Sequence, residues 1–143
     1  MRRLPQNAKV EALKRAPLFQ GLSKRDLTAL ARVTEDLQVP AGTVLCKEGG
    51  LGREFFVIVE GSAEVTRAGK RLATRGDGEF FGEIGLLTTA TRTATVRATT
   101  PLRCLILTRG DFRRVLDENR SIERKVMAAL AERLASYGAD AAL

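Results

Sequence analysis

Residues 55–75, FFVIVEGSAEVTRAGKRLATR, are the clearest guide to the architecture of this chain. They contain three strand-like runs, Phe55–Glu60, Ala63–Arg67 and Arg71–Arg75. Gly61-Ser62 and Ala68-Gly69-Lys70 separate these runs. Short breaks that contain glycine, between runs rich in branched and aromatic residues, are typical of strands joined by tight turns. The first run is apolar at every position but its last, as expected for a central strand covered on both faces.

The same pattern continues on both sides of this stretch. Four more strands are predicted at Leu37–Val39, Thr43–Cys46, Arg92–Ala98 and Arg103–Leu107. Seven short strands at this spacing, with turn signals between them, indicate an all-β sandwich or barrel. The sequence therefore predicts a mainly β fold, a jelly-roll-like β-roll.

Helical patterns flank the strands. Residues 7–16 have helical spacing, and Ser23-Lys24-Arg25-Asp26 has the form of a capping box at the start of a second helix. Thr108 and Asp111 can cap a third helix, and the helix predicted after Asn119 carries an apolar stripe formed by Ile122, Val126, Leu130, Leu134 and Tyr137. We expect one domain over 1–143, with N-terminal helices in 7–35, the β-roll in 36–108 and C-terminal helices in 109–138.

Composition excludes several classes of protein. The chain of 143 residues has no histidine, so Ser-His and Cys-His catalysis and histidine metal sites are absent. Cys46 and Cys104 are its only cysteines, and both fall in predicted strands as small core residues. No apolar run is long enough to span a membrane, and the N-terminus lacks the pattern of a secretory signal. We expect a cytoplasmic protein with no metal, no cofactor and no catalytic residues.

The segment 79–96 interrupts the rhythm of the strands. Glu83–Leu87 suits a single helical turn, whose first N–H groups have no partner inside the turn and carry a positive partial charge. Gly82 and Gly85 would let a ligand approach this backbone closely. The segment therefore predicts an anion-binding site.

Arg92 is the second indication of an anion site. In the predicted strand its side chain shares a face with three apolar residues, Ala94, Val96 and Ala98, while Thr93 lies on the other face. A buried cation is costly without a partner, so Arg92 needs an anion. Glu83 or a bound phosphate would supply one. A carboxylate such as Glu83 would also accept a hydrogen bond from a ribose hydroxyl.

Residues 81–96, FGEIGLLTTATRTATV, resemble the phosphate-binding cassette of the cyclic nucleotide-binding domain family. That cassette reads roughly Phe-Gly-Glu-(Leu/Ile)-Ala-Leu-Leu, a short spacer, then Pro-Arg-x-Ala-x-Val, and it aligns here with no change of length. The glycine-rich loop before Glu54 and the stretch LFQGLSKRDL near the N-terminus also fit. The resemblance covers about residues 14–137.

The resemblance implies roles for particular residues. Glu83 would take the ribose 2′-hydroxyl, Arg92 would pair with the cyclic phosphate, and the N–H of Gly85 with the N–H or hydroxyl of Thr93 would complete the phosphate cradle. Gly82 and Ile84 would shape the pocket. A residue of the last helix often covers the base in this family, and Met127 and Leu130 are the candidates here.

This sequence departs from the family at two positions of the cassette. Gly85 stands where alanine is commonest, and Thr91 stands where proline usually precedes the arginine. Because proline fixes φ, Thr91 is expected to leave the turn less organised and to reduce the affinity for the ligand. Thr93 is compatible with cAMP and with cGMP, and we favour cAMP.

We expect a non-catalytic sensor of cyclic nucleotides. One alternative is a degenerate interaction module that binds no nucleotide. Another is the regulatory domain of a larger transcription factor, channel or enzyme, with an effector that the sequence does not name. Only 23 residues follow residue 120, too few for a helix-turn-helix, so no DNA-binding motif is expected. The apolar stripe of the last helix would allow a homodimer.

Overall fold

The computed structural model describes residues 3–82 and 91–137. The helical elements are α1 (Gln6–Arg15), the short 3₁₀ helix η1 (Pro17–Phe19), α2 (Lys24–Val33), α4 (Arg109–Glu118) and α5 (Arg120–Tyr137). The strands are β1 (Glu35–Val39), β2 (Val44–Cys46), β3 (Glu54–Glu60), β4 (Ala63–Arg67), β5 (Lys70–Arg75), β6 (Phe80–Phe81), β7 (Thr95–Ala98) and β8 (Leu102–Thr108).

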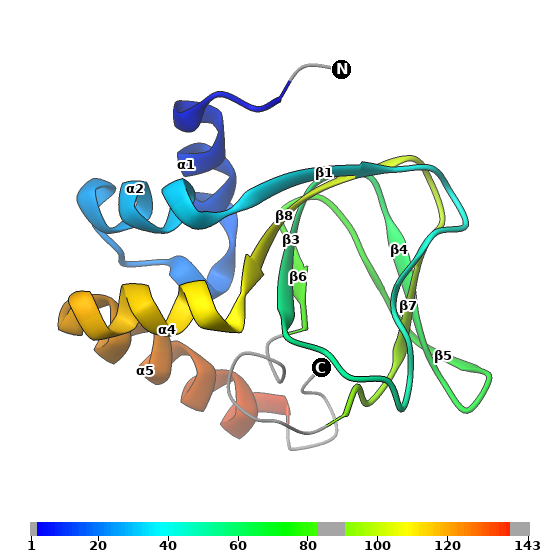
Figure 1. The fold of residues 1–143 in the computed structure, drawn as a ribbon. Coiled ribbons are helices and arrows are strands. Elements are labelled where there is room, and N and C mark those ends of the chain that lie inside the picture. Colours follow the sequence, from blue (N-terminus) through cyan, green and yellow to red (C-terminus); the bar gives the residue numbers. More distant parts are fainter. Residues whose placement is uncertain (1–2, 83–90, 138–143) are drawn as a thin grey trace.

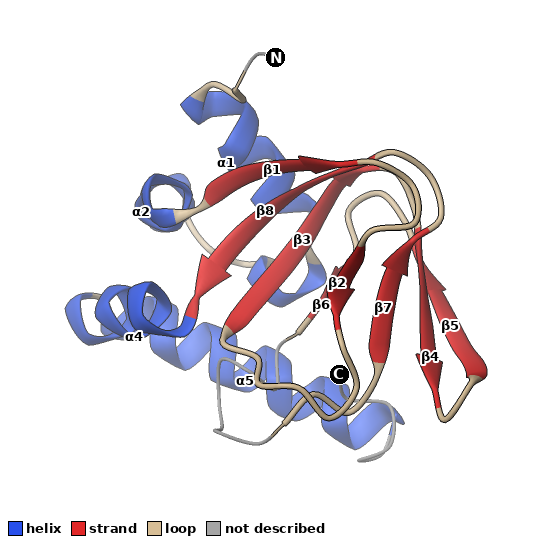
Figure 2. Cartoon of the chain, turned by 45° about the vertical axis from the view of Figure 1, so that its right-hand side comes forward, coloured by secondary structure: helices blue, strands red, loops and turns tan. Residues whose placement is uncertain are grey.

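The strands form two four-stranded sheets that face each other (Figure 2). The first sheet has the order β1-β8-β3-β6 and the second the order β2-β7-β4-β5, and every pair is antiparallel. Strands β3 and β8 are the central strands of the first sheet, which confirms the prediction that the apolar run of β3 is a central strand. The predicted β-roll with flanking helices is confirmed.

The helices cover one face of the first sheet, and the second sheet lies on its other side (Figure 1). Alternate residues of β3 therefore enter two separate cores. Phe55 and Val57 pack with the helices, and Phe56 and Ile58 pack inside the roll against the second sheet. This arrangement explains why β3 has no polar face.

The predicted helix caps are present. The backbone N–H of Asp26 donates to Ser23 Oγ over 3.1 Å, and the N–H of Asp111 donates to Thr108 Oγ1 over 3.2 Å. These bonds satisfy donors that the first turn of a helix leaves without a partner. Of the predicted apolar stripe on α5, Ile122, Val126 and Leu130 are buried, and the side chains of Leu134 and Tyr137 lie outside the described residues.

Two predictions about the strands need correction. The pair Phe80–Phe81 forms the short strand β6 against β3, so the described residues contain eight strands, where seven were predicted. The strand predicted from Arg92 begins only at Thr95. The backbone of Arg92 is hydrogen-bonded instead to Gly49 and Gly50, in the loop after β2. The predicted turn Glu83–Leu87 lies outside the described residues.

Candidate functional site

Arg92 is buried although it carries a positive charge. Its side chain and backbone together are only 9% exposed. Its Nη2 donates to the carbonyl oxygen of Glu54 over 2.8 Å, and its Nη1 donates to the carbonyl oxygen of Gly82 over 3.4 Å. Both acceptors are neutral, so these bonds fix the direction of the guanidinium without cancelling its charge. A buried cation held in this way attracts an anion strongly, because little water screens it.

The backbone of Arg92 is fixed by the glycine-rich loop between β2 and β3. The N–H of Arg92 donates to the carbonyl of Gly50 over 2.8 Å, and the N–H of Gly49 donates to the carbonyl of Arg92 over 2.9 Å. Two opposed bonds hold this short segment in a ladder-like pair. These two bonds fix the backbone of Arg92 directly after Thr91, the position at which the family usually has proline.

Two glycines let the backbone approach the guanidinium closely. A Cβ atom built on Gly52 would lie 1.8 Å from Nε of Arg92. A Cβ on Gly82 would lie 2.7 Å from the carbonyl oxygen of Glu54 and 3.0 Å from Nη1 of Arg92, and Gly82 has a φ of +90°, which favours glycine. Any larger residue at Gly52 would displace the guanidinium, so the position of the cation depends on this glycine.

A recess opens beside the guanidinium at the edge of the inner core. The described residues that line it are Cys46, Gly82, Arg92, Thr93, Ala94 and Val96. Cys46, Ala94 and Val96 are buried apolar residues of the core inside the roll. The recess has a volume of about 10 Å³ between the described residues, and it combines one fixed cation with an apolar wall. A fixed cation of this kind suits an anionic group.

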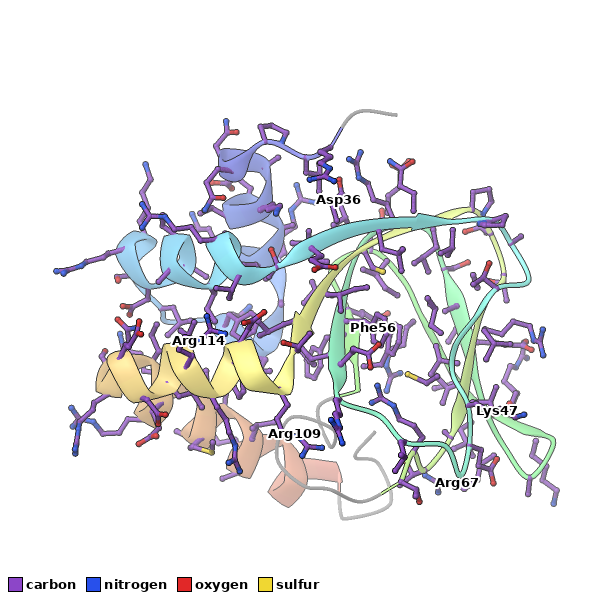
Figure 3. The ribbon with its side chains drawn as sticks, viewed as in Figure 1. Asp36, Lys47, Phe56, Arg67, Arg109 and Arg114 are labelled. Atoms are coloured by element: carbon purple, nitrogen blue, oxygen red, sulfur yellow. The ribbon has the colours of Figure 1, made fainter. Side chains whose placement is uncertain are left out.

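The segment after Arg92 is tied to the hairpin of β4 and β5. Nε of Arg67 donates to the carbonyl of Thr93 over 2.9 Å. Glu48 accepts a bond from the N–H of Ala68 and donates its own N–H to Thr95 Oγ1. Figure 3 shows Arg67 and Lys47 at the lower end of the roll in that view. These bonds leave the side chain of the exposed Thr93 available to a ligand.

The structure brings three of the predicted site residues together: Gly82, Arg92 and Thr93. Glu83, Ile84 and Gly85 lie outside the described residues, so Glu83 as a partner of Arg92 stays a prediction. The proposed alternation after Arg92 is correct, because Ala94, Val96 and Ala98 are buried and Thr93 is exposed. On α5, Met127 is 40% exposed, and Leu130 belongs to the core that joins the helices to the first sheet.

Three further residues belong to the site, and the sequence alone did not assign them to it. Gly52 packs on the guanidinium, Glu54 supplies a backbone acceptor, and Cys46 lines the recess. The glycine-rich loop before Glu54 was a signal for Gly52 alone, since a run of glycines allows close backbone approach. A backbone carbonyl leaves no mark in the sequence. The position of Cys46 follows from the pairing of β2 with β7.

Within residues 3–82 and 91–137, no group of three His, Cys, Asp or Glu residues could hold a metal ion. The same residues contain no helix that is long and apolar enough to cross a membrane. Cys46 and Cys104 are both buried and form no disulfide, which agrees with their prediction as core residues.

Comparison with known proteins agrees with this geometry. The sequence profile of the family "Cyclic nucleotide-binding domain" matches residues 36–119. The chain therefore belongs to the cyclic nucleotide-binding domain family.

Members of three different kinds of protein resemble it. A cyclic nucleotide-gated potassium channel of Rhizobium etli is 35% identical over 117 residues, which are 82% of this chain and 33% of the channel. The N-terminal domain of a transcriptional regulator from Streptomyces coelicolor has a TM-score of 0.78 at 29% identity, covering 87% of this chain and 91% of that domain. The regulatory domain of Toxoplasma gondii PKA, crystallised with cAMP, has a TM-score of 0.71 at 25% identity, covering 77% of this chain and 44% of that one. This chain spans about a third of the length of the channel.

Proposed function

We propose that this chain is a sensor that binds cAMP and catalyses no reaction. The observation that supports this most is the buried guanidinium of Arg92, which is held by two neutral carbonyl oxygens beside an apolar recess. A cyclic phosphate carries a single negative charge, which matches the single charge of this arginine. The pairing would satisfy a cation that is otherwise costly to bury.

The remaining contacts are proposed from the family resemblance. Glu83 would accept a hydrogen bond from the ribose 2′-hydroxyl, and the N–H of Gly85 would donate to the phosphate. The N–H or the hydroxyl of Thr93 would donate to the same group, and Gly82 and Ile84 would shape the wall. The structure of a relative crystallised with cAMP supports the choice of base, and the hydroxyl of Thr93 would also tolerate cGMP.

The output of the sensor is proposed to be a movement of the C-terminal helix. The side chain of Met127 is exposed and would cover the base in the closed arrangement, whereas Leu130 packs in the helical core. Such coupling requires that the ligand bind the closed arrangement more tightly than the open one. If Met127 covers the bound base as a lid, then Met127→Ala tests this role without removing a residue of the hydrophobic core. A faster dissociation of cAMP would support the lid, and an unchanged rate would count against it.

The proposal is tested by calorimetric titration of the purified chain with cAMP, cGMP and 5′-AMP. We expect micromolar or tighter binding of cAMP, weaker binding of 5′-AMP, and loss of both in an Arg92→Ala variant that remains folded by circular dichroism. The control is Arg97→Ala, because Arg97 is an exposed arginine in β7, five residues after Arg92, and it donates to the carbonyl of Gly42. The absence of heat with every nucleotide would refute the sensor and favour a nucleotide-free interaction module.

A further inference from the structure

A second cavity lies at the other end of the first sheet. It has a volume of about 490 Å³ and is lined by Gln38, Val39, Pro40, Glu60, Pro101, Leu102 and Arg103. Binding sites for small molecules have volumes of about 300–1,000 Å³, so the size fits an organic ligand. The ends of β1 and β3 and the start of β8 form its walls, near the upper end of the roll in Figure 1.

This cavity is separate from the recess at Arg92. Strand β3 connects the two sites, because the carbonyl of Glu54 at its start holds Arg92 and Glu60 at its end lines the cavity. Six steps of about 3.3 Å along a strand place the two ends about 20 Å apart. A ligand in the cavity is therefore a second ligand, not an extension of the first.

Three polar side chains form a row across the floor of the cavity. Strand register pairs Gln38 with Arg103 and Arg103 with Glu60, so the three residues are neighbours across three strands. Directly paired residues in antiparallel strands point to the same face of the sheet, which applies to Gln38 and Arg103. The register of β3 with β8 shifts between Ile58 and Glu60, and Glu60 still lines the same cavity as Gln38 and Arg103. The row therefore offers an amide, a guanidinium and a carboxylate side by side, between apolar walls from Val39, Pro40, Pro101 and Leu102.

The charge that the row of Gln38, Arg103 and Glu60 presents to a ligand depends on which of these side chains is already paired with another residue. Asp36, which Figure 3 labels, accepts bonds from Nε and Nη2 of Arg103 at 2.9 and 2.5 Å, so the positive charge of Arg103 is compensated. Asp36 also accepts the N–H of Leu4 over 2.8 Å, which fixes this pair further. Glu60 interacts with Arg103 only through its charge, and among the described residues no hydrogen bond is formed by the side chain of Gln38 or of Glu60. One carboxylate and one amide therefore face the cavity.

We propose that this cavity binds a small organic cation, an amine or guanidinium group on an apolar or aromatic stem. The charged head pairs with the carboxylate of Glu60 and donates a hydrogen bond to the amide oxygen of Gln38. The stem lies between the two prolines. An anionic ligand is disfavoured, because the arginine of the row is already neutralised and the remaining charge is negative.

The proposal is tested by two-dimensional amide NMR of the purified chain, titrated with tyramine, 4-ethylphenol and 4-hydroxyphenylacetate. These probes share an aromatic stem and differ in the charge of the head. We expect saturable shifts at Gln38, Leu102 and Arg103 with tyramine, a millimolar or lower dissociation constant, weaker binding of the neutral probe and no saturable shift with the acid.

The Glu60→Gln variant removes the charge at nearly constant shape and is expected to weaken tyramine at least fivefold. Its matched control, Glu64→Gln, lies on the second sheet and is expected to change nothing. Equal binding of the three probes, or tyramine binding that survives Glu60→Gln, would overturn the proposal, as would the absence of saturable shifts with tyramine. Arg92→Ala must leave tyramine binding unchanged, so this result is independent of whether the chain binds cAMP.

Discussion

Gly52 has no room for a methyl group on the side that faces Arg92. A Cβ there would lie 1.8 Å from Nε, 2.2 Å from Cζ and 2.4 Å from Cδ of Arg92, and ordinary van der Waals contact begins at 3.4 Å. In a Gly52→Ala variant the guanidinium must therefore move by about 1.6 Å, the difference between 3.4 and 1.8 Å. The end of an arginine side chain can make this movement while the backbone stays in place.

The movement breaks the alignment of the guanidinium with the carbonyl of Glu54 and with a bound phosphate. A hydrogen bond to a charged group contributes about 1.5–3 kcal/mol, so the affinity for cAMP should fall about 10- to 150-fold. The free energy of unfolding should change much less. Gly52 does not have a positive φ, so alanine fits its backbone, and the lower entropy of the unfolded chain contributes about 0.4–1 kcal/mol of stability.

Calorimetry with cAMP and urea denaturation of the same samples measure the two quantities. Gly110→Ala is the matched control, because a Cβ added to this residue of α4 would meet no side chain or neighbouring element within 4 Å. The control should bind cAMP as the unmodified chain does. If folded Gly52→Ala binds cAMP within twofold of the unmodified chain, then the position of the guanidinium does not determine affinity, and the reasoning fails.

Three further predictions concern the fold. Ala68 has a φ of +51° in the two-residue turn between β4 and β5, a conformation that asparagine tolerates better than alanine. The Ala68→Asn variant should therefore have a free energy of unfolding about 0.5–1 kcal/mol higher in urea titrations. A lower free energy of unfolding would show that the backbone of Ala68 is not strained. The hydrogen-bonded ion pair with Arg103 lowers the pKa of Asp36. The ion pair therefore stabilises the fold fully at a pH above the ordinary pKa of aspartate. This stabilisation is lost as the pH falls from the ordinary pKa of aspartate through the lowered pKa of Asp36 in the folded chain. The stability advantage over Asp36→Asn, about 1–3 kcal/mol at neutral pH, should therefore shrink between about pH 5 and pH 3, and an advantage that is constant over this range would be evidence against the pair. Burial raises the pKa of Cys104 to about 12. In a Cys46→Ser chain, a thiol reagent at about pH 8 should therefore label Cys104 only when the chain unfolds. Rapid labelling of the folded chain would show that the thiol is accessible.

Much of the fold was predictable because its signals are local. Turn residues such as Gly61 and Gly69 mark the ends of strands, and the side chains of Ser23 and Thr108 mark the starts of helices. The apolar run of β3 shows that both faces of this strand are covered. Strand β6 was missed because two residues are too few for a pattern. The order in which the strands pair depends on contacts between residues far apart in the sequence, and the spacing of apolar residues along the chain does not reveal such contacts.

The site was predictable only where side chains carry it. The alternation after Arg92 correctly placed the arginine on the buried face, although the strand begins three residues later than predicted. The carbonyls of Glu54 and Gly82 hold the guanidinium, and any residue type offers a carbonyl, so the sequence does not reveal them. The close packing of Gly52 likewise depends on how the loop folds back on Arg92.

The central claim is that Arg92 binds the phosphate of a cyclic nucleotide. The most direct test measures the affinities of the unmodified chain and of Arg92→Ala for cAMP and for adenosine, which has the same base and no phosphate. The unmodified chain should prefer cAMP by at least tenfold, and in Arg92→Ala the two affinities should converge, with that for adenosine nearly unchanged. If Arg92→Ala keeps the full preference for cAMP, or if the unmodified chain shows none, then Arg92 does not bind the phosphate and the account is wrong.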